Sequence, residues 1–186
     1  MTSLKQLTFN NIIFNAAAKI ISVVFLGVAS IILARTLLPS DYGIVGFAMI
    51  FVNFLSQFND LGFSSAVVQR KELDDRALYT GFTFRLGLGV FLYLVALAGS
   101  GASMWFIDNE AVADVIKVSA LSFLISSISF VPTALLKREL SYKKISIANM
   151  SYSMTNSLLA IVLALTGFKY WSIVLANLCA GIVMVV

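Results

Sequence analysis

Long apolar runs separated by short polar segments fill the chain from one end to the other. The first run, at 12–34, is long enough as a helix to cross a hydrocarbon core of about 30 Å, because a helix rises about 1.5 Å per residue. Runs of similar character recur along the whole length and stop at polar residues. The pattern predicts six transmembrane helices, at 12–34, 43–66, 79–103, 114–136, 145–166 and 171–186.

The joints on one side of the predicted membrane are short. They lie at 35–42, 104–113 and 167–170, so we expect the two helices that flank each joint to form an antiparallel hairpin. In the first joint, Ser40 is expected to cap the second helix, while the carboxylate of Asp41 interacts with the positive end of its dipole.

Two features depart from this regular pattern. Pro132 lies inside the fourth run, where its missing N–H group predicts a kink in the helix. A static kink is enough to account for a proline at this position, and a hinge that moves during transport is the alternative. The sixth run is shorter than a bilayer and reaches Val186 without a polar exit, so we expect this run to be truncated and the chain to be part of a longer protein.

Composition supports an all-α, multi-pass membrane protein. Apolar residues make up 60% of the chain and charged residues 12%, whereas about a quarter of a soluble domain is charged.

The first run is too long for the apolar region of a signal peptide, and no small-residue cleavage site follows it, so we expect it to be retained in the mature protein. The single cysteine excludes an intrachain disulfide, and the absence of histidine removes the commonest general base and metal ligand. We therefore expect no catalytic residues, metal or cofactor.

The positions of the basic residues indicate how the chain is oriented in the membrane and do not indicate a binding partner. The net charge is +4, but Lys and Arg are scattered among spans and loops, which argues against nucleic acid as a ligand. A cytoplasmic N-terminus satisfies the positive-inside rule, with eight basic residues on the cytoplasmic side and three outside. The eight are Lys5, Arg70, Lys71, Arg76, Lys137, Arg138, Lys143 and Lys144, and the three are Arg35, Lys117 and Lys169.

Three ionisable residues lie inside the predicted spans, on three consecutive helices. Lys19 is about 10 Å into the first span, and Asp60 and Arg85 lie at a similar depth in the second and third. A charge at a helix centre costs about 2.5–3.5 kcal/mol on insertion scales. Pairing of Asp60 with either base would lower that cost and leave one positive charge that could receive a phosphate. The alternative is that both bases extend to the cytoplasmic headgroups, and that Asp60 sits at a helix break near Gly62.

Four stretches, in this order along the chain, resemble bacterial polysaccharide exporters. These belong to the oligosaccharide flippase branch of the multidrug/oligosaccharidyl-lipid/polysaccharide exporter superfamily, and the similarity is strongest to the branch that contains the colanic acid exporter. The stretches are LARTLLPSDYG at 33–43, DLGFSSAVVQRKE at 60–72, LLKREL at 135–140 and YWS at 170–172.

The resemblance implies a fold, a substrate and partners. Members have two lobes of six helices, so the whole chain, 1–186, is similar to an N-terminal lobe whose C-terminal lobe is missing. The implied function is to flip an undecaprenyl-diphosphate-linked oligosaccharide across the bacterial inner membrane for exopolysaccharide, capsule or O-antigen synthesis. The implied partners are this lipid-linked oligosaccharide, the bilayer, the missing lobe and the polysaccharide polymerase machinery.

Polar residues at helical spacing extend the list of candidate ligands for such a substrate. Polar stripes on the first two spans must face protein or a watery cavity, although interhelical hydrogen bonds alone would explain their amides. The stripes are Asn11, Asn15, Lys19 and Ser22 on the first span and Asn53, Gln57, Asp60 and Ser64 on the second. On the fifth span, Asn149, Tyr152, Ser153 and Asn156 could bind sugar hydroxyls, with the same alternative. The candidate substrate-binding residues are Asn15, Lys19, Asn53, Gln57, Asp60, Arg85, Asn149 and Asn156.

Other functions stay open at this stage. A drug/cation antiporter of the same superfamily should bury more acid than base, whereas here two bases accompany one acid. An enzyme that polymerises or ligates lipid-linked sugars should have a sizeable outer loop, and the outer joints are short. A truncated fragment that transports nothing is the third alternative.

Overall fold

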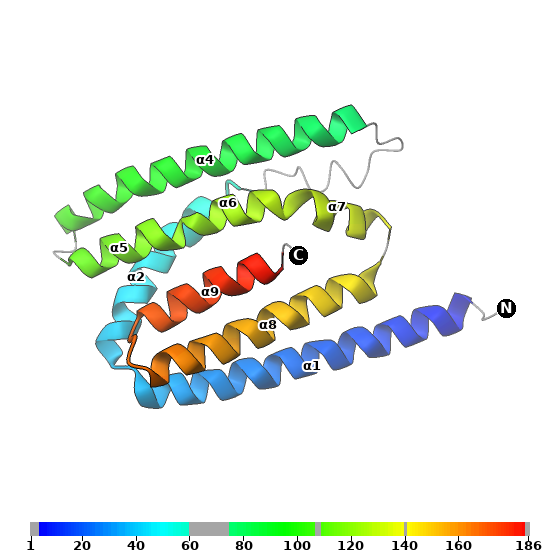
Figure 1. Cartoon of the computed structure of the whole chain (residues 1–186), viewed down its shortest axis with the longest axis horizontal. Helices are drawn as coiled ribbons and strands as arrows, with labels where there is room; N and C mark the ends of the chain where they lie inside the picture. Colours follow the sequence, from blue (N-terminus) through cyan, green and yellow to red (C-terminus); the bar gives the residue numbers. More distant parts are fainter. Residues whose placement is uncertain (1–3, 60–74, 107–108, 140, 185–186) are drawn as a thin grey trace.

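The computed structural model describes residues 4–59, 75–106, 109–139 and 141–184. These residues form helices joined by short turns, and no strand occurs among them (Figure 1). The all-α class predicted from the sequence is confirmed. The helices are α1 (Leu4–Thr36), α2 (Pro39–Ser56), α4 (Asp75–Phe106), α5 (Glu110–Ser119), α6 (Leu121–Ile128), α7 (Phe130–Arg138), α8 (Tyr142–Leu165) and α9 (Trp171–Val183).

Four segments of the described chain are long and apolar enough to cross a membrane. They correspond to the predicted first, third, fourth and fifth spans, and they are Ile13–Thr36, Tyr79–Gly101, Glu110–Ile128 and Lys143–Leu165. The predicted number of six is not confirmed. Helix α2 ends at Ser56, and most of the remainder of the predicted second span lies outside the described residues. Helix α9 has 13 residues, or about 20 Å of helix.

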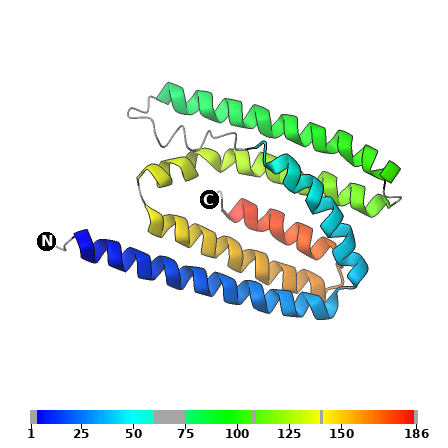
Figure 2. The same ribbon diagram turned by 180° about the vertical axis from the view of Figure 1, so that it is seen from behind.

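The helices form two packed groups. Helix α1 lies along α8, and α8 lies along α9, whereas α2, α4, α5 and α6 pack together on the other side of α9 (Figure 1). Figure 2 shows α2 running from the end of α1 across to the group that contains α4. The expectation that the first two helices pack as a hairpin is therefore wrong. The buried residues of α2 recur every three to four positions, and this face packs on α5 and α4 instead of on α1.

Each group has its own apolar core, and α9 contributes to both. The larger core contains Val52, Leu92 and Phe123 together with Val174 and Leu178 of α9. The smaller core joins α1, α8 and α9 mainly through small residues, which allow helix backbones to approach closely. Its buried members are Ala29, Leu33, Leu37, Ala160, Ala164 and Ala176.

The turn between α1 and α2 has a different cap from the one expected. The backbone N–H of Leu38 donates to a carboxylate oxygen of Asp41 at 3.0 Å, and the N–H of Asp41 donates to the Leu38 carbonyl at 2.9 Å. Ser40 lies inside the first turn of α2 and is not the cap, because the helix already begins at Pro39. Proline suits this first position since its missing N–H would have no partner there.

The predicted fourth span is divided into α5, α6 and α7. The division between α6 and α7 falls at Ser129, three residues before Pro132. Proline cannot bond to the carbonyl four residues earlier, and its ring clashes with that carbonyl, which explains the interruption. Serine hydroxyls bond back to the carbonyls nearby, from Ser127 to Phe123 at 2.7 Å and from Ser129 to Ile125 at 3.0 Å, and such bonds bend helices.

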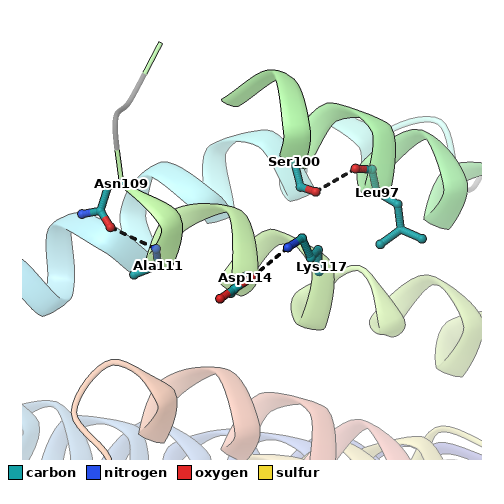
Figure 3. A network of polar contacts seen from close by, with 6 residues as sticks. All are labelled: Leu97, Ser100, Asn109, Ala111, Asp114 and Lys117. Carbon is teal, nitrogen blue, oxygen red and sulfur yellow. Dashed lines mark hydrogen bonds and ion pairs between the residues drawn. The ribbon is translucent and has the colours of Figure 1, made fainter. Parts of the chain in front are cut away.

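The start of α5 is fixed by side-chain capping (Figure 3). The Asn109 side-chain oxygen accepts a bond from the Ala111 N–H at 3.0 Å, and Lys117 pairs with Asp114 at 2.8 Å one turn later. Helix α5 thus begins four residues before the predicted start of the fourth span.

Candidate functional site

A polar cavity lies between α1 and α8, and we call it the Lys19 cavity. Its volume is about 300 Å³. The polar stripe of the first span faces this cavity, as the helical spacing of its residues predicts. The lining residues are Asn15, Ala18, Lys19, Ser22, Ser146, Asn149, Tyr152 and Ser153.

Among the described residues, the Lys19 ammonium has no acidic partner. The Ser146 hydroxyl donates to the Asn15 side-chain oxygen at 2.6 Å and links α8 to α1. The Ser22 hydroxyl bonds back to the Ala18 carbonyl at 2.9 Å. Lys19 is exposed, and no carboxylate among the described residues forms an ion pair with it. An uncompensated cation on an apolar helix is suited to binding an anion.

A second cavity lies between the two helix groups, and we call it the Arg85 cavity. Its volume is about 360 Å³, and its lining comes from α4, α6, α7, α8 and α9. The guanidinium carbon of Arg85 lies 5.3 Å from the centre of the Phe130 ring, in cation–π geometry. Arg85 is only 8% exposed. Its charge is therefore held inside the protein, in contrast to that of Lys19.

Arg85 is bonded to the framework through its side chain and its main chain. Its guanidinium donates to the Asn59 carbonyl just beyond the end of α2. The amide of Asn59 donates to the Ser126 hydroxyl of α6 at 2.8 Å, and the Ser127 hydroxyl donates to the Arg85 carbonyl at 3.1 Å. These bonds connect α2, α4 and α6 at one point.

The Lys19 and Arg85 cavities meet at Tyr152, whose side chain lines both. The Asn177 amide of α9 donates to the Tyr152 hydroxyl at 3.1 Å. Asn177 also lines a third cavity of about 260 Å³, which contains Asn156 and which we call the Asn156 cavity. The Tyr152–Asn177 pair therefore lies where three cavities adjoin.

The structure distributes the residues predicted from sequence over these cavities. Asn15, Lys19 and Asn149 line the first cavity, Arg85 the second and Asn156 the third. Asn53 and Gln57 are exposed on or just beyond α2 and line none of the three. Asp60 and its expected pairing with Lys19 or Arg85 lie outside the described residues.

Sequence reasoning missed two residues of this region. Asn177 is the single amide in the last apolar run, and that isolation could have indicated a polar neighbour. Asn59 could have been found from its place beside Asp60, although its carbonyl contact with Arg85 has no sequence signal.

The chemistry of the three cavities suits binding better than catalysis. They present one exposed ammonium, one buried guanidinium, several amides and several hydroxyls. Within the described ranges, no group of three or more His, Cys, Asp or Glu side chains could hold a metal ion. Cations and neutral hydrogen-bonding groups in apolar surroundings can bind an anionic head together with a hydroxylated chain.

Comparisons with known proteins give a consistent result. A family model described as "Polysaccharide biosynthesis protein" matches residues 32–186. The lipopolysaccharide biosynthesis protein WzxC of Escherichia coli (strain K12) is 25% identical over 150 residues, which cover 80% of this chain and 30% of WzxC. The succinoglycan biosynthesis transport protein ExoT of Rhizobium meliloti (strain 1021) is 25% identical over 142 residues, which cover 76% of this chain and 29% of ExoT.

A third relative covers more of the chain. An uncharacterized membrane protein in the cps region of Klebsiella pneumoniae is 24% identical over 194 residues, which cover 91% of this chain and 40% of that protein. The chain thus spans between 29% and 40% of the lengths of these three relatives. No solved structure matches it.

Proposed function

This chain belongs to the polysaccharide biosynthesis protein family, and we propose that it forms the N-terminal, six-helix lobe of a flippase for lipid-linked oligosaccharide. In this proposal the complete protein spans the bacterial inner membrane with a cytoplasmic N-terminus. It moves an undecaprenyl-diphosphate-linked oligosaccharide to the outer leaflet, where the polymerase machinery uses it. The names of WzxC and ExoT support a role in polysaccharide transport, and the apolar helices support a membrane protein.

The observation that carries the proposal is the Lys19 cavity. A diphosphate needs a cation and hydrogen-bond donors, and the cavity offers the ammonium of Lys19 and the amide of Asn149. Lys19 has no acidic partner among the described residues, so its charge is not neutralised within this part of the chain. Asn15 also lines the cavity, and Ser146 holds its side-chain oxygen in place.

The other candidate residues take roles according to their positions. Arg85 adds positive charge to the adjoining cavity, and Asn156 contributes an amide to the third. Exposed Asn53 and Gln57 belong to a surface that faces the second lobe. The diphosphate enters near Lys19, the prenyl tail stays in lipid, and rocking of the two lobes moves the head across the membrane.

Replacement of Lys19 tests this function. In cells whose polysaccharide export depends on the complete protein, Lys19→Ala should abolish export, and Lys19→Arg should retain part of it because the charge remains. The measurement is the amount of polymer at the cell surface at equal membrane levels of each variant. Lys117→Ala is the matched control, because Lys117 is an exposed lysine paired with Asp114 and lies outside the three cavities.

Two outcomes would contradict the proposal. Normal export in the Lys19→Ala strain would place the ammonium at the cytoplasmic headgroups, where it has no substrate to bind. Equal loss in the Lys117→Ala strain would show that removal of any lysine impairs the protein.

A further inference from the structure

The Tyr152–Asn177 pair lies at the boundary between the Lys19 cavity and the Arg85 cavity. On the side of the Lys19 cavity, the nearest ionisable group in the lining is the ammonium itself. On the other side, α8 and α9 supply the Tyr152 hydroxyl and the Asn177 amide to the lining of the Arg85 cavity. Arg85 lies on α4 instead, where it donates to the Asn59 carbonyl.

Hydrogen bonds inside the protein fix which groups remain for a ligand. The Tyr152 oxygen accepts from Asn177, so the phenol O–H remains as a donor and the Asn177 side-chain oxygen remains as an acceptor. The Ser126 and Ser129 hydroxyls donate to the Phe123 and Ile125 carbonyls, and the Ser126 oxygen already accepts from the Asn59 amide, so the Ser129 oxygen remains as an acceptor. The wall therefore presents both donors and acceptors, which suits a ligand that carries hydroxyl groups.

The size and lining of the Arg85 cavity also fit a small polar ring. A volume of about 360 Å³ is within the range of ligand pockets. The Tyr152 ring and Phe130 provide flat apolar surface beside the hydroxyl-bearing wall. Sugars combine an apolar C–H face with a rim of hydroxyls, so such a wall can contact both kinds of surface.

We propose that the Tyr152–Asn177 wall of the Arg85 cavity is a binding site for the uncharged sugar next to the diphosphate. The site rests on the proposed function and assigns the two parts of the substrate to different residues. Lys19 binds the anionic diphosphate, whereas Tyr152 and Asn177 form hydrogen bonds with the first sugar. Because Tyr152 lines both cavities, it sets the spacing between the charged group and that sugar.

Two probes separate these roles in the complete protein, purified in lipid nanodiscs. One is undecaprenyl diphosphate without sugar, and the other is undecaprenyl diphosphate that carries the oligosaccharide of the host. Tyr152→Phe and Asn177→Leu should each weaken binding of the glycosylated probe by about fivefold to tenfold and leave the sugar-free probe unchanged. Lys19→Ala should weaken both probes. Tyr170→Phe is the matched control, because Tyr170 lies in a turn, where its ring contacts that of Trp171, and lines none of the three cavities.

The outcomes distinguish failure of this site from failure of the proposed function. If the wild-type protein binds neither probe, the flippase proposal fails and this site fails with it. If it binds both probes and the Tyr152 and Asn177 variants lose neither, or lose both equally, the sugar site alone is overturned. Thermal unfolding of each variant provides the structural readout, and a variant that loses the glycosylated probe without a lower unfolding temperature supports direct contact.

Discussion

Lys19 and Arg85 look alike in the sequence, since each is a single base inside an apolar run, but their surroundings differ. Lys19 is exposed in a polar cavity on α1 and has no acidic partner among the described residues. Arg85 is buried on α4, donates to a backbone carbonyl and lies over an aromatic ring. The difference shows that two bases with the same sequence pattern can lie in different surroundings, one open to a cavity and the other bonded to the backbone of a neighbouring segment.

The same contrast extends to the helix groups that carry the two residues. The α1–α8 interface has the Lys19 cavity with its polar side chains at one end and small apolar residues beside the Asn156 cavity at the other. The group with α4 has the larger apolar core, and at Gly89 the α4 backbone comes close to α6. We expect substitutions in the α4 group to affect stability and substitutions in the α1–α8 cavity to affect transport.

The largest loss of stability is expected from Gly89→Ala. A Cβ atom at this position would clash with the Ser127 hydroxyl and would lie 2.9 Å from the Phe123 carbonyl oxygen. Separation of α4 from α6 to relieve the contact should lower the free energy of unfolding by about 3 kcal/mol. Denaturant titration of the purified protein in detergent measures this change.

Gly87 provides the matched control on the same helix. A Cβ atom at Gly87 meets no atom within 4 Å, so Gly87→Ala should leave the free energy of unfolding unchanged or raise it by up to about 1 kcal/mol. Similar destabilisation by both variants would mean that α4 and α6 are not in close contact at Gly89.

A smaller loss is expected from Arg85→Leu. The variant removes the bond to the Asn59 carbonyl and the contact with Phe130, and the free energy of unfolding should fall by about 2 kcal/mol. Arg85→Lys should recover only part of that loss, because an ammonium lacks the planar fork of the guanidinium. Lys19→Ala, measured in the same way, should leave stability within about 0.5 kcal/mol of wild type. Equal stability losses at the two positions would remove the distinction between them.

The smallest effect is expected where α8 bonds to α1. Ser146→Ala removes the hydroxyl that donates to Asn15, and an interhelical bond of this kind contributes about 0.6 kcal/mol on average. Ser30→Ala is the control, because Ser30 is an exposed serine on α1 for which the described residues provide no hydrogen bond. The difference in unfolding free energy between the two variants measures the contribution of the Ser146–Asn15 hydrogen bond to stability. A difference of several kcal/mol would contradict the expectation that this interface contributes less to stability than the α4–α6 contact.

Helical periodicity predicted the part of the site that lies on one helix. Asn15, Lys19 and Ser22 share a face because they are three or four residues apart, and this spacing alone predicted that they line one surface. The long apolar runs likewise predicted helices in the right places, since length and hydropathy are local properties.

Contacts between distant helices could not be predicted in this way. Helix α1 packs on α8, although α2 follows it in sequence, because packing depends on which surfaces fit. The partner of Arg85 is a backbone carbonyl, and every residue has one, so no residue type marks it. Pro132 predicted an interruption of the fourth span, but the position at Ser129 follows from the carbonyl that proline obstructs.

The interruption at Ser129 has a mechanical consequence for the Arg85 cavity. Ser126 lies before the joint and Thr133 after it, and both belong to the wall of the cavity. The width of the Arg85 cavity therefore depends on the angle between α6 and α7, because each helix carries part of its wall. Helix α7 also packs against α8, so a shift of α8 relative to α6 would change that angle if α7 moves with α8.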